Sequence, residues 1–182
     1  MSSVFSNPHG RAADAAREYV NAIVGVVGDS NPVELLAVFP QRLTAAISGL
    51  NQDVLRRPER EGKWSIAEVL NHLADTELVQ SVRLRLVLAQ DRPRITGFDQ
   101  DAWAKRFDYR NADPRRALDR FEIVRAGNID LLRGVAAEDW KRIGVHEERG
   151  EETLELMAKL VAGHDLVHLR QIARIKEAVG AR

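Results

Sequence analysis

Helical periodicity is the feature that most restricts the fold of this chain, because strand-like alternation of apolar and polar residues is nearly absent. Apolar residues recur every three or four positions in four long segments, at approximately residues 31–49, 65–90, 113–133 and 153–178. Amphipathic helices of this kind bury their apolar faces against one another. The sequence therefore predicts an all-α fold, a four-helix bundle with long connections.

Three of these helices have clear start signals. In Asn31-Pro32 and Asp113-Pro114, a side chain that can cap a helix precedes a proline suited to the first helical position. The segment Ser65-Ile66-Ala67-Glu68 has the pattern of a capping box. Pro40 interrupts the first bundle helix, where we expect a kink.

The segments outside the bundle helices indicate how the domain is organised and how its helices are connected. A further helix is expected from about Arg11 to Val27, so that residues 1–30 form an N-terminal helical extension and residues 31–182 the bundle, within a single domain overall. Residues 91–112, with a short helix near 100–106, and residues 134–150 form connections longer than antiparallel neighbours need. They are expected either to cross over, making some neighbouring helices parallel, or to cap one end of the bundle.

Composition narrows the class of protein. The 182 residues include 27 basic and 27 acidic residues, and this zero net charge argues against a dedicated nucleic-acid or anionic-membrane binder. The arginines at 83, 85, 92 and 94 are expected to form a solvated face. The absence of cysteine excludes disulfides, thiolate metal sites and a cysteine nucleophile. With no recognisable signal peptide or long apolar run, a cytoplasmic protein is expected.

Three histidines occupy positions where a helical bundle would ordinarily place apolar residues. His164 and His168 are four residues apart, so they share one face of the last helix, and His72 lies among apolar residues on the helix of residues 65–90. Neutral imidazoles aimed at one point from two helices suit a divalent transition metal. Three protein ligands would leave positions for water or substrate, as in catalytic sites. The alternative is that the histidines are ordinary core residues with hydrogen-bond partners.

Other polar residues lie near this set. Asp75 follows His72 by one turn and is the candidate catalytic residue, able to orient a ligand imidazole or to accept a proton. Asn128 can line the site or pair with backbone. Asp165 and Gln171 can support the histidines, although a surface ion pair is equally consistent for Asp165. His146 lies in a polar loop and is expected to be solvated.

Several familiar catalytic motifs are missing from the sequence. It contains no G-x-S-x-G, no P-loop and no H-E-x-x-H. It also lacks the Glu-x-x-His pairs of carboxylate di-iron bundles. A mononuclear site is therefore favoured over a binuclear one.

The segments that carry the histidines resemble a known family, the DinB-like (DinB/YfiT) superfamily of metal-dependent enzymes. The resemblance lies in residues 62–77, which contain Trp64 and His72, in residues 150–154 and 164–172, and in Asp101-Ala102-Trp103-Ala104 of the connection. It implies a four-helix bundle with two long connections and a divalent metal, commonly nickel or zinc, held by His72, His164 and His168. Members are often dimeric, and characterised members include thiol-dependent S-transferases and a mycothiol-dependent isomerase.

Two hypotheses of function follow. In the first, the chain is a mononuclear metalloenzyme acting on a small-molecule substrate, either as an S-transferase with a low-molecular-weight thiol as cosubstrate or as a hydrolase. The resemblance places S-transfer slightly ahead, and it also implies a possible homodimer. In the second, the metal stabilises a non-catalytic binding or stress-response module, since metal loading stabilises a fold whether or not a reaction follows.

Overall fold

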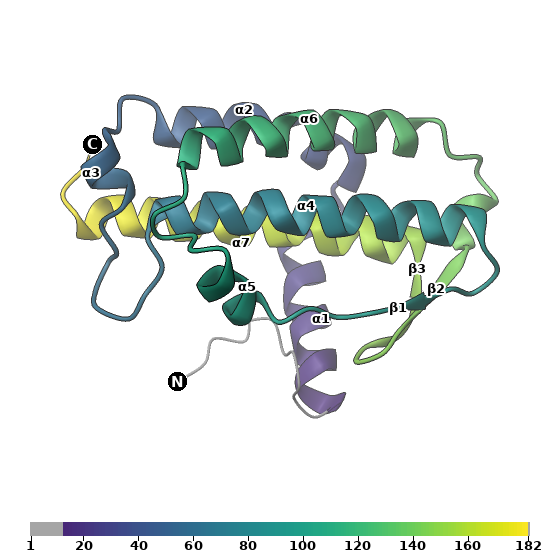
Figure 1. Ribbon diagram of the computed structural model, residues 1–182. Coiled ribbons are helices and arrows are strands. Elements are labelled where there is room, and N and C mark those ends of the chain that lie inside the picture. The colour runs from purple at the N-terminus through teal and green to yellow at the C-terminus, as the bar shows by residue number, and fades with distance from the viewer. Residues whose placement is uncertain (1–12, 182) are drawn as a thin grey trace.

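The computed structural model describes residues 13–181, which are mostly helical (Figure 1). Small strands and one 3-10 turn occupy the connections. In chain order, the elements are α1 Ala13–Val27, α2 Pro32–Ile47, α3 Gln52–Leu55, α4 Ile66–Ala89, β1 Arg94–Ile95, α5 Gln100–Arg106, α6 Pro114–Arg133, η1 Asp139–Lys141, β2 Ile143–His146, β3 Gly150–Thr153 and α7 Leu154–Ala178.

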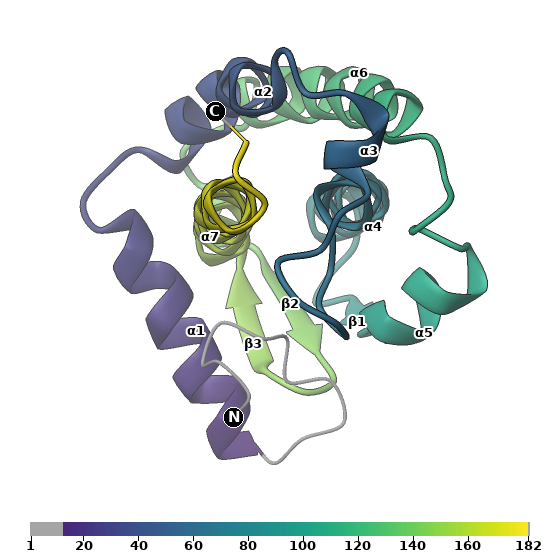
Figure 2. The ribbon, with the colours of Figure 1, turned by 90° about the vertical axis from the view of Figure 1, so that its left-hand side faces the viewer.

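Four long helices form the bundle, with α2 and α6 in one layer and α7 and α4 in the other (Figure 2). Their facing sides contain most of the buried apolar side chains, among them Phe39, Leu43, Leu70, Phe121 and Ile172. The predicted all-α four-helix bundle is thereby confirmed.

Contacts between helices show that some neighbours run parallel. Between α4 and α6, residue 71 contacts residue 120, residue 77 contacts 125 and residue 85 contacts 128, so both numbers rise together. This arrangement is possible because the connection through β1 and α5 returns along the bundle to the end where α4 began (Figure 1). The connection of residues 91–112 is therefore a crossover, one of the two alternatives that the sequence allowed. Residues 134–150 instead join the end of α6 to the start of α7 at the same end of the bundle (Figure 1).

The predicted caps are present at the helix starts. The Asn31 side chain accepts a hydrogen bond from the backbone N–H of Val33 at 2.9 Å, and that of Asp113 accepts one from Arg115 at 2.9 Å. Ser65 and Glu68 form the reciprocal capping box. These bonds satisfy N–H groups that have no partner within the helix. The helix α2 continues through Pro40.

A small three-stranded sheet was not expected from the sequence. Strand β2 pairs antiparallel with β3, placing Val145 opposite Glu151, and parallel with β1, placing Val145 opposite Arg94. These strands have only two to four residues, too few to display a recognisable alternation. His146 lies on β2 and is buried, so the prediction that it is solvated is wrong.

The N-terminal helix packs against α7. Tyr19 and Ile23 form a small apolar cluster with Leu160, and Gly163 allows the close approach, because a Cβ atom there would lie 2.5 Å from the Ile23 carbonyl oxygen. Arg11 and Ala12, the expected first residues of this helix, lie outside the described residues. The division of the chain at residue 30 stays a prediction.

The helices were also compared with the requirements for a membrane span. Within residues 13–181, no single helix is long and apolar enough to cross a membrane. The segments Asp14–Val27 and Pro32–Ile47, bent by 79° relative to each other, meet the criterion together by length and composition alone.

A buried charge network joins all four bundle helices. Arg125 on α6 donates two hydrogen bonds to the carboxylate of Glu77 on α4, at 2.9 and 2.7 Å. Its Nη1 donates to Asp165 on α7 at 2.6 Å and to the Leu36 carbonyl on α2 at 3.4 Å. Asn128 donates to Glu77 at 2.7 Å. With only 1% of Arg125 exposed, these partners replace the water that its charge has lost.

Replacing Arg125 should therefore destabilise the fold strongly. We expect Arg125→Met to lower the free energy of unfolding in urea by about 3–5 kcal/mol, because it leaves Glu77 and Asp165 without their counter-charge in the interior. Arg174→Met is the matched control: Arg174 pairs with Glu59 at 2.6 Å but is 59% exposed, and exposed pairs contribute about 0–1 kcal/mol. Equal losses in the two variants would contradict this role of Arg125.

Candidate metal centre

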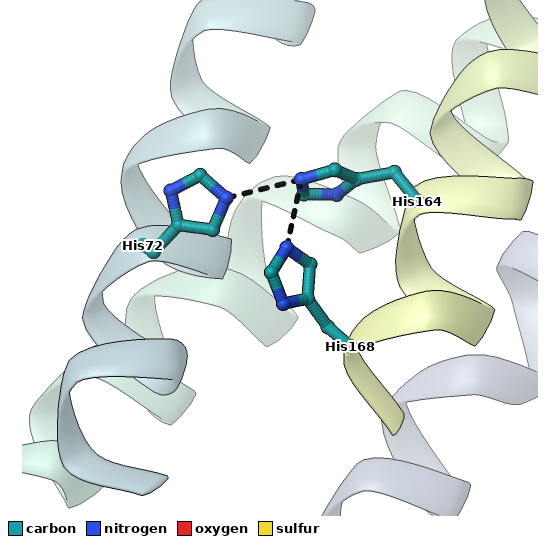
Figure 3. A group of neighbouring side chains, drawn as sticks. All are labelled: His72, His164 and His168. Atoms are coloured by element: carbon teal, nitrogen blue, oxygen red, sulfur yellow. Dashed lines mark hydrogen bonds between the residues drawn. The ribbon is translucent and has the colours of Figure 1, made fainter. Parts of the chain in front are cut away.

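Three histidine side chains converge between α4 and α7 (Figure 3). The Nε2 atom of His164 lies 3.0 Å from Nε2 of His72 and 3.0 Å from Nε2 of His168. One candidate ligand atom from each residue lies within 4.8 Å of the others. The structure thus brings together the three histidines that the sequence analysis selected.

Helix geometry explains this convergence. His164 and His168 are one turn apart on α7, so their rings project from the same face. His72 comes from α4, which lies beside α7 in the bundle and runs in the opposite direction (Figure 1). Its ring centroid is 5.1 Å from that of His164 and 4.8 Å from that of His168. The centroid of the Trp64 ring lies 5.0 Å from that of His72.

Burial keeps these imidazoles neutral. Desolvation, with a further contribution from the neighbouring imidazoles, lowers the pKa of His72 and that of His164 well below the usual value. Desolvation also lowers the pKa of His168 to about 4, opposed by its hydrogen bond to Gln171. A neutral imidazole keeps the lone pair that a metal ion requires.

Gln171 determines which nitrogen of His168 carries the proton. The Nδ1 atom of His168 lies 2.7 Å from Oε1 of Gln171. Because an amide oxygen only accepts hydrogen bonds, Nδ1 is the protonated nitrogen and Nε2 presents its lone pair to the other histidines. Gln171 therefore supports the site, one of the roles considered for it from the sequence.

One metal ion satisfies the three Nε2 atoms better than hydrogen bonds among the histidines do. Each Nε2 atom holds either one proton or one lone pair. Because Nε2 of His168 carries a lone pair, Nε2 of His164 can donate its one hydrogen bond to that atom. It then has no lone pair left to accept a hydrogen bond from His72, whose Nε2 lies at the equally short distance of 3.0 Å. A cation that accepts three lone pairs satisfies all three nitrogens. His72 is buried, whereas His164 and His168 are half-buried.

Asp75, the candidate catalytic residue, has other partners. Its Oδ2 accepts a hydrogen bond from the Tyr109 hydroxyl at 2.6 Å, and its Oδ1 lies 4.0 Å from the guanidinium of Arg120. These contacts hold the segment that follows α5 against α4. Neither contact connects Asp75 to a histidine. Its catalytic role stays a prediction.

The remaining polar residues belong to other parts of the structure. Asn128 bonds to Glu77 and accepts a hydrogen bond from Arg85, so it serves the charge network. Asp165 is buried in its ion pair with Arg125, not at the surface. Arg83, expected to be solvated, is buried and donates to a backbone carbonyl of the connection, so that prediction is wrong.

Sequence reasoning missed Glu77 and Arg125, although a signal was available. Arg125 follows Phe121 by four residues and precedes Leu132 by seven, so it lies on the inward stripe of α6. Glu77 has the same relation to Leu73 and Leu84 on α4. Opposite charges on the apolar stripes of two helices indicate a buried pair, because neither charge is stable there alone.

The histidines should make the stability of the metal-free protein depend on pH. Because the pKa of His168 falls from 6.5 to about 4 on folding, the unfolded chain binds more protons between these values. The free energy of unfolding should therefore rise with pH across this window, and the slope should become shallower in His168→Gln. Denaturant titrations at several pH values measure the slopes. Identical slopes in both proteins would show that His168 is not held neutral.

Comparisons with known proteins agree with this fold. The sequence profile of the DinB superfamily matches residues 35–172. A protein of Bacillus subtilis named "Putative metal-dependent hydrolase YfiT" is 28% identical over 149 residues, which are 81% of this chain and 84% of that protein. A "Putative metal-dependent hydrolase" of Geobacillus thermodenitrificans is 30% identical over 143 residues, 78% of this chain and 80% of that one.

A solved structure is also similar. YfiT from Bacillus subtilis, described as a probable metal-dependent hydrolase with an unusual four-helix bundle topology, superposes with a TM-score of 0.78 and 27% identity over 83% of this chain and 87% of that one. The match of the family profile over most of the sequence leads to one conclusion. This chain belongs to the DinB superfamily.

Proposed function

We propose that His72, His164 and His168 hold one divalent transition-metal ion and that the chain is a metal-dependent hydrolase of a small molecule. The observation that carries this proposal is the convergence of three neutral Nε2 atoms, which hydrogen bonding alone does not satisfy. When bound, such an ion supplies Lewis-acid chemistry, polarising a substrate oxygen or activating water at neutral pH.

The surrounding residues support a catalytic centre over a purely structural one. Gln171 fixes the tautomer of His168, and burial keeps all three rings neutral. A structural metal site is closed by four protein ligands, whereas a catalytic site keeps an open position. Among the described residues, three histidines form the candidate set, and two of them retain exposed surface. A non-catalytic, metal-stabilised module is therefore the less favoured hypothesis.

Hydrolysis is favoured over S-transfer by the names that the relatives carry. Thiol-dependent transfer, the choice between nickel and zinc, a homodimer and a cytoplasmic location all stay predictions. Because the chain has no cysteine, any thiol must be a separate cosubstrate. A screen of ester, amide and thiol–electrophile substrates, each with and without added low-molecular-weight thiol, separates the two reactions.

Metal content tests the ligand assignment. Protein purified without an affinity tag should contain about one metal ion per chain by plasma mass spectrometry, since the three histidines form one site. His168→Ala should lose most of this metal while remaining helical by circular dichroism. His146→Ala is the matched control, because His146 is also buried but lies on β2 outside the site. Full metal content in a His72/His164/His168 triple-alanine variant would refute the proposal.

We also propose that Asp75 assists the reaction as a proton acceptor. Asp75→Asn should then lower kcat/KM by about 100-fold or more, in the range for general acid–base catalysis, without changing metal content. Tyr109→Phe is the control, because it removes the hydrogen bond to Asp75 but keeps the carboxylate. Equal losses of kcat/KM in both variants would show that Asp75 only holds the connection against α4. Loss of metal in Asp75→Asn would show that Asp75 is a metal ligand.

A further inference from the structure

Arg83 on α4 is a buried cation without a counter-charge in contact. Only 6% of this residue is exposed, yet its guanidinium makes no ion pair within residues 13–181. Its Nη2 atom donates a hydrogen bond to the Thr96 carbonyl, and its Cζ lies 6.0 Å from the centre of the Phe98 ring. Arg125, which is also buried, contacts two carboxylates. Buried charges ordinarily have such partners, and the described part of the chain provides none for Arg83.

Part of the Arg83 guanidinium is unbonded and reaches the surface. Its Nε and Nη1 atoms donate no hydrogen bond to the described residues, and neither is among the fully buried atoms that lack a partner. Both atoms therefore keep solvent-accessible surface. The same holds for the hydroxyl of Tyr19 on α1, which has no hydrogen-bond partner in residues 13–181 and is not fully buried. Small molecules in solution can thus contact both side chains.

A second arginine lies beside these two donors. Thr96, which accepts the hydrogen bond from Arg83, directly follows β1, and β1 pairs with the end of β2 from which the turn containing Arg149 begins. Of all charged groups, Arg149 has the largest effect on the pKa of Arg83 and on the pKa of Tyr19. The three side chains, from α4, the β2–β3 turn and α1, are therefore close neighbours.

The charges of this cluster favour an anion. Burial, together with the neighbouring Arg149, lowers the pKa of Arg83 to about 10, so Arg83 is charged at neutral pH. Three carboxylates oppose this shift more weakly and form no ion pair with Arg83, those of Glu152, Glu148 and Glu147. The first of them is already bonded to Nε and Nη2 of Arg149. Burial raises the pKa of Tyr19, so its hydroxyl keeps the proton that it can donate.

We propose that Arg83, Arg149 and Tyr19 form a binding site for the anionic group of a small molecule, a carboxylate or a phosphate. Guanidinium groups bind such oxygens through charge-assisted hydrogen bonds, and the tyrosine hydroxyl supplies a further donor. Arg83 lies about 16 Å from His72 along α4, at 1.5 Å per residue. The anion site is therefore separate from the three histidines and does not depend on a metal there.

The test uses inorganic phosphate and acetate as probes, with calorimetric titration at an ionic strength held constant by chloride. Arg83→Met should weaken anion binding by about 10-fold or more, the effect of a charge-assisted hydrogen bond, and Tyr19→Phe by about 3- to 10-fold. Arg85→Met is the matched control, because Arg85 is also on α4 but is exposed and bonds Asn128 at 3.0 Å. His168→Ala should bind the anion as wild type does, since the site is separate from the histidines.

A second measurement distinguishes binding from a structural role of Arg83, even if its replacement destabilises the fold. A ligand that binds only the folded state raises the urea midpoint. Phosphate should therefore raise the midpoint of wild type and of Arg85→Met more than that of Arg83→Met, whereas the general stabilisation by this salt is the same in all three. Equal increases would overturn the proposal. So would unchanged anion affinity in Arg83→Met or Tyr19→Phe, or a wild type that binds neither phosphate nor acetate.

Discussion

The burial of one guanidinium in the centre of the bundle is the constraint on which the rest of the structure depends. Arg125 cannot lie in an apolar interior without counter-charges. Glu77 on α4 and Asp165 on α7 provide them, with the α2 backbone as a further acceptor. Because these bonds are directional, they fix the rotation and the axial register of the helices as well as their distance. Apolar contacts alone tolerate small shifts that this network does not.

The network and the histidines use the same two helices. Asp165 follows His164 directly on α7, and Glu77 lies little more than one turn beyond His72 on α4. Fixing Glu77 and Asp165 to one side chain therefore also fixes how α4 and α7 present the histidines. Nε2 atoms that must share one ion need this precision, because metal–nitrogen distances vary little. The burial of a charge in the core thus has a consequence for the site beside it.

Much of the fold could be predicted because it depends on local chemistry. The helix starts at Asn31, Ser65 and Asp113 are set by side chains that bond to backbone within three residues. Burial of His146 and Arg83 could not be predicted in this way. Both depend on segments distant in sequence, the pairing of β2 with β1 and the packing of the connection against α4. The polar composition of these segments predicted that both side chains are exposed to solvent, whereas tertiary contacts bury them.

The same distinction between local and tertiary contacts applies to the candidate site. The sequence by itself determined that His164 and His168 share a helix face and that His72 lies on an apolar helix, because spacing and periodicity are properties of single helices. Only the tertiary structure decided that the three Nε2 atoms meet. Distances between helices depend on how the bundle packs, and that packing is set by contacts such as those of Arg125, which no single segment contains.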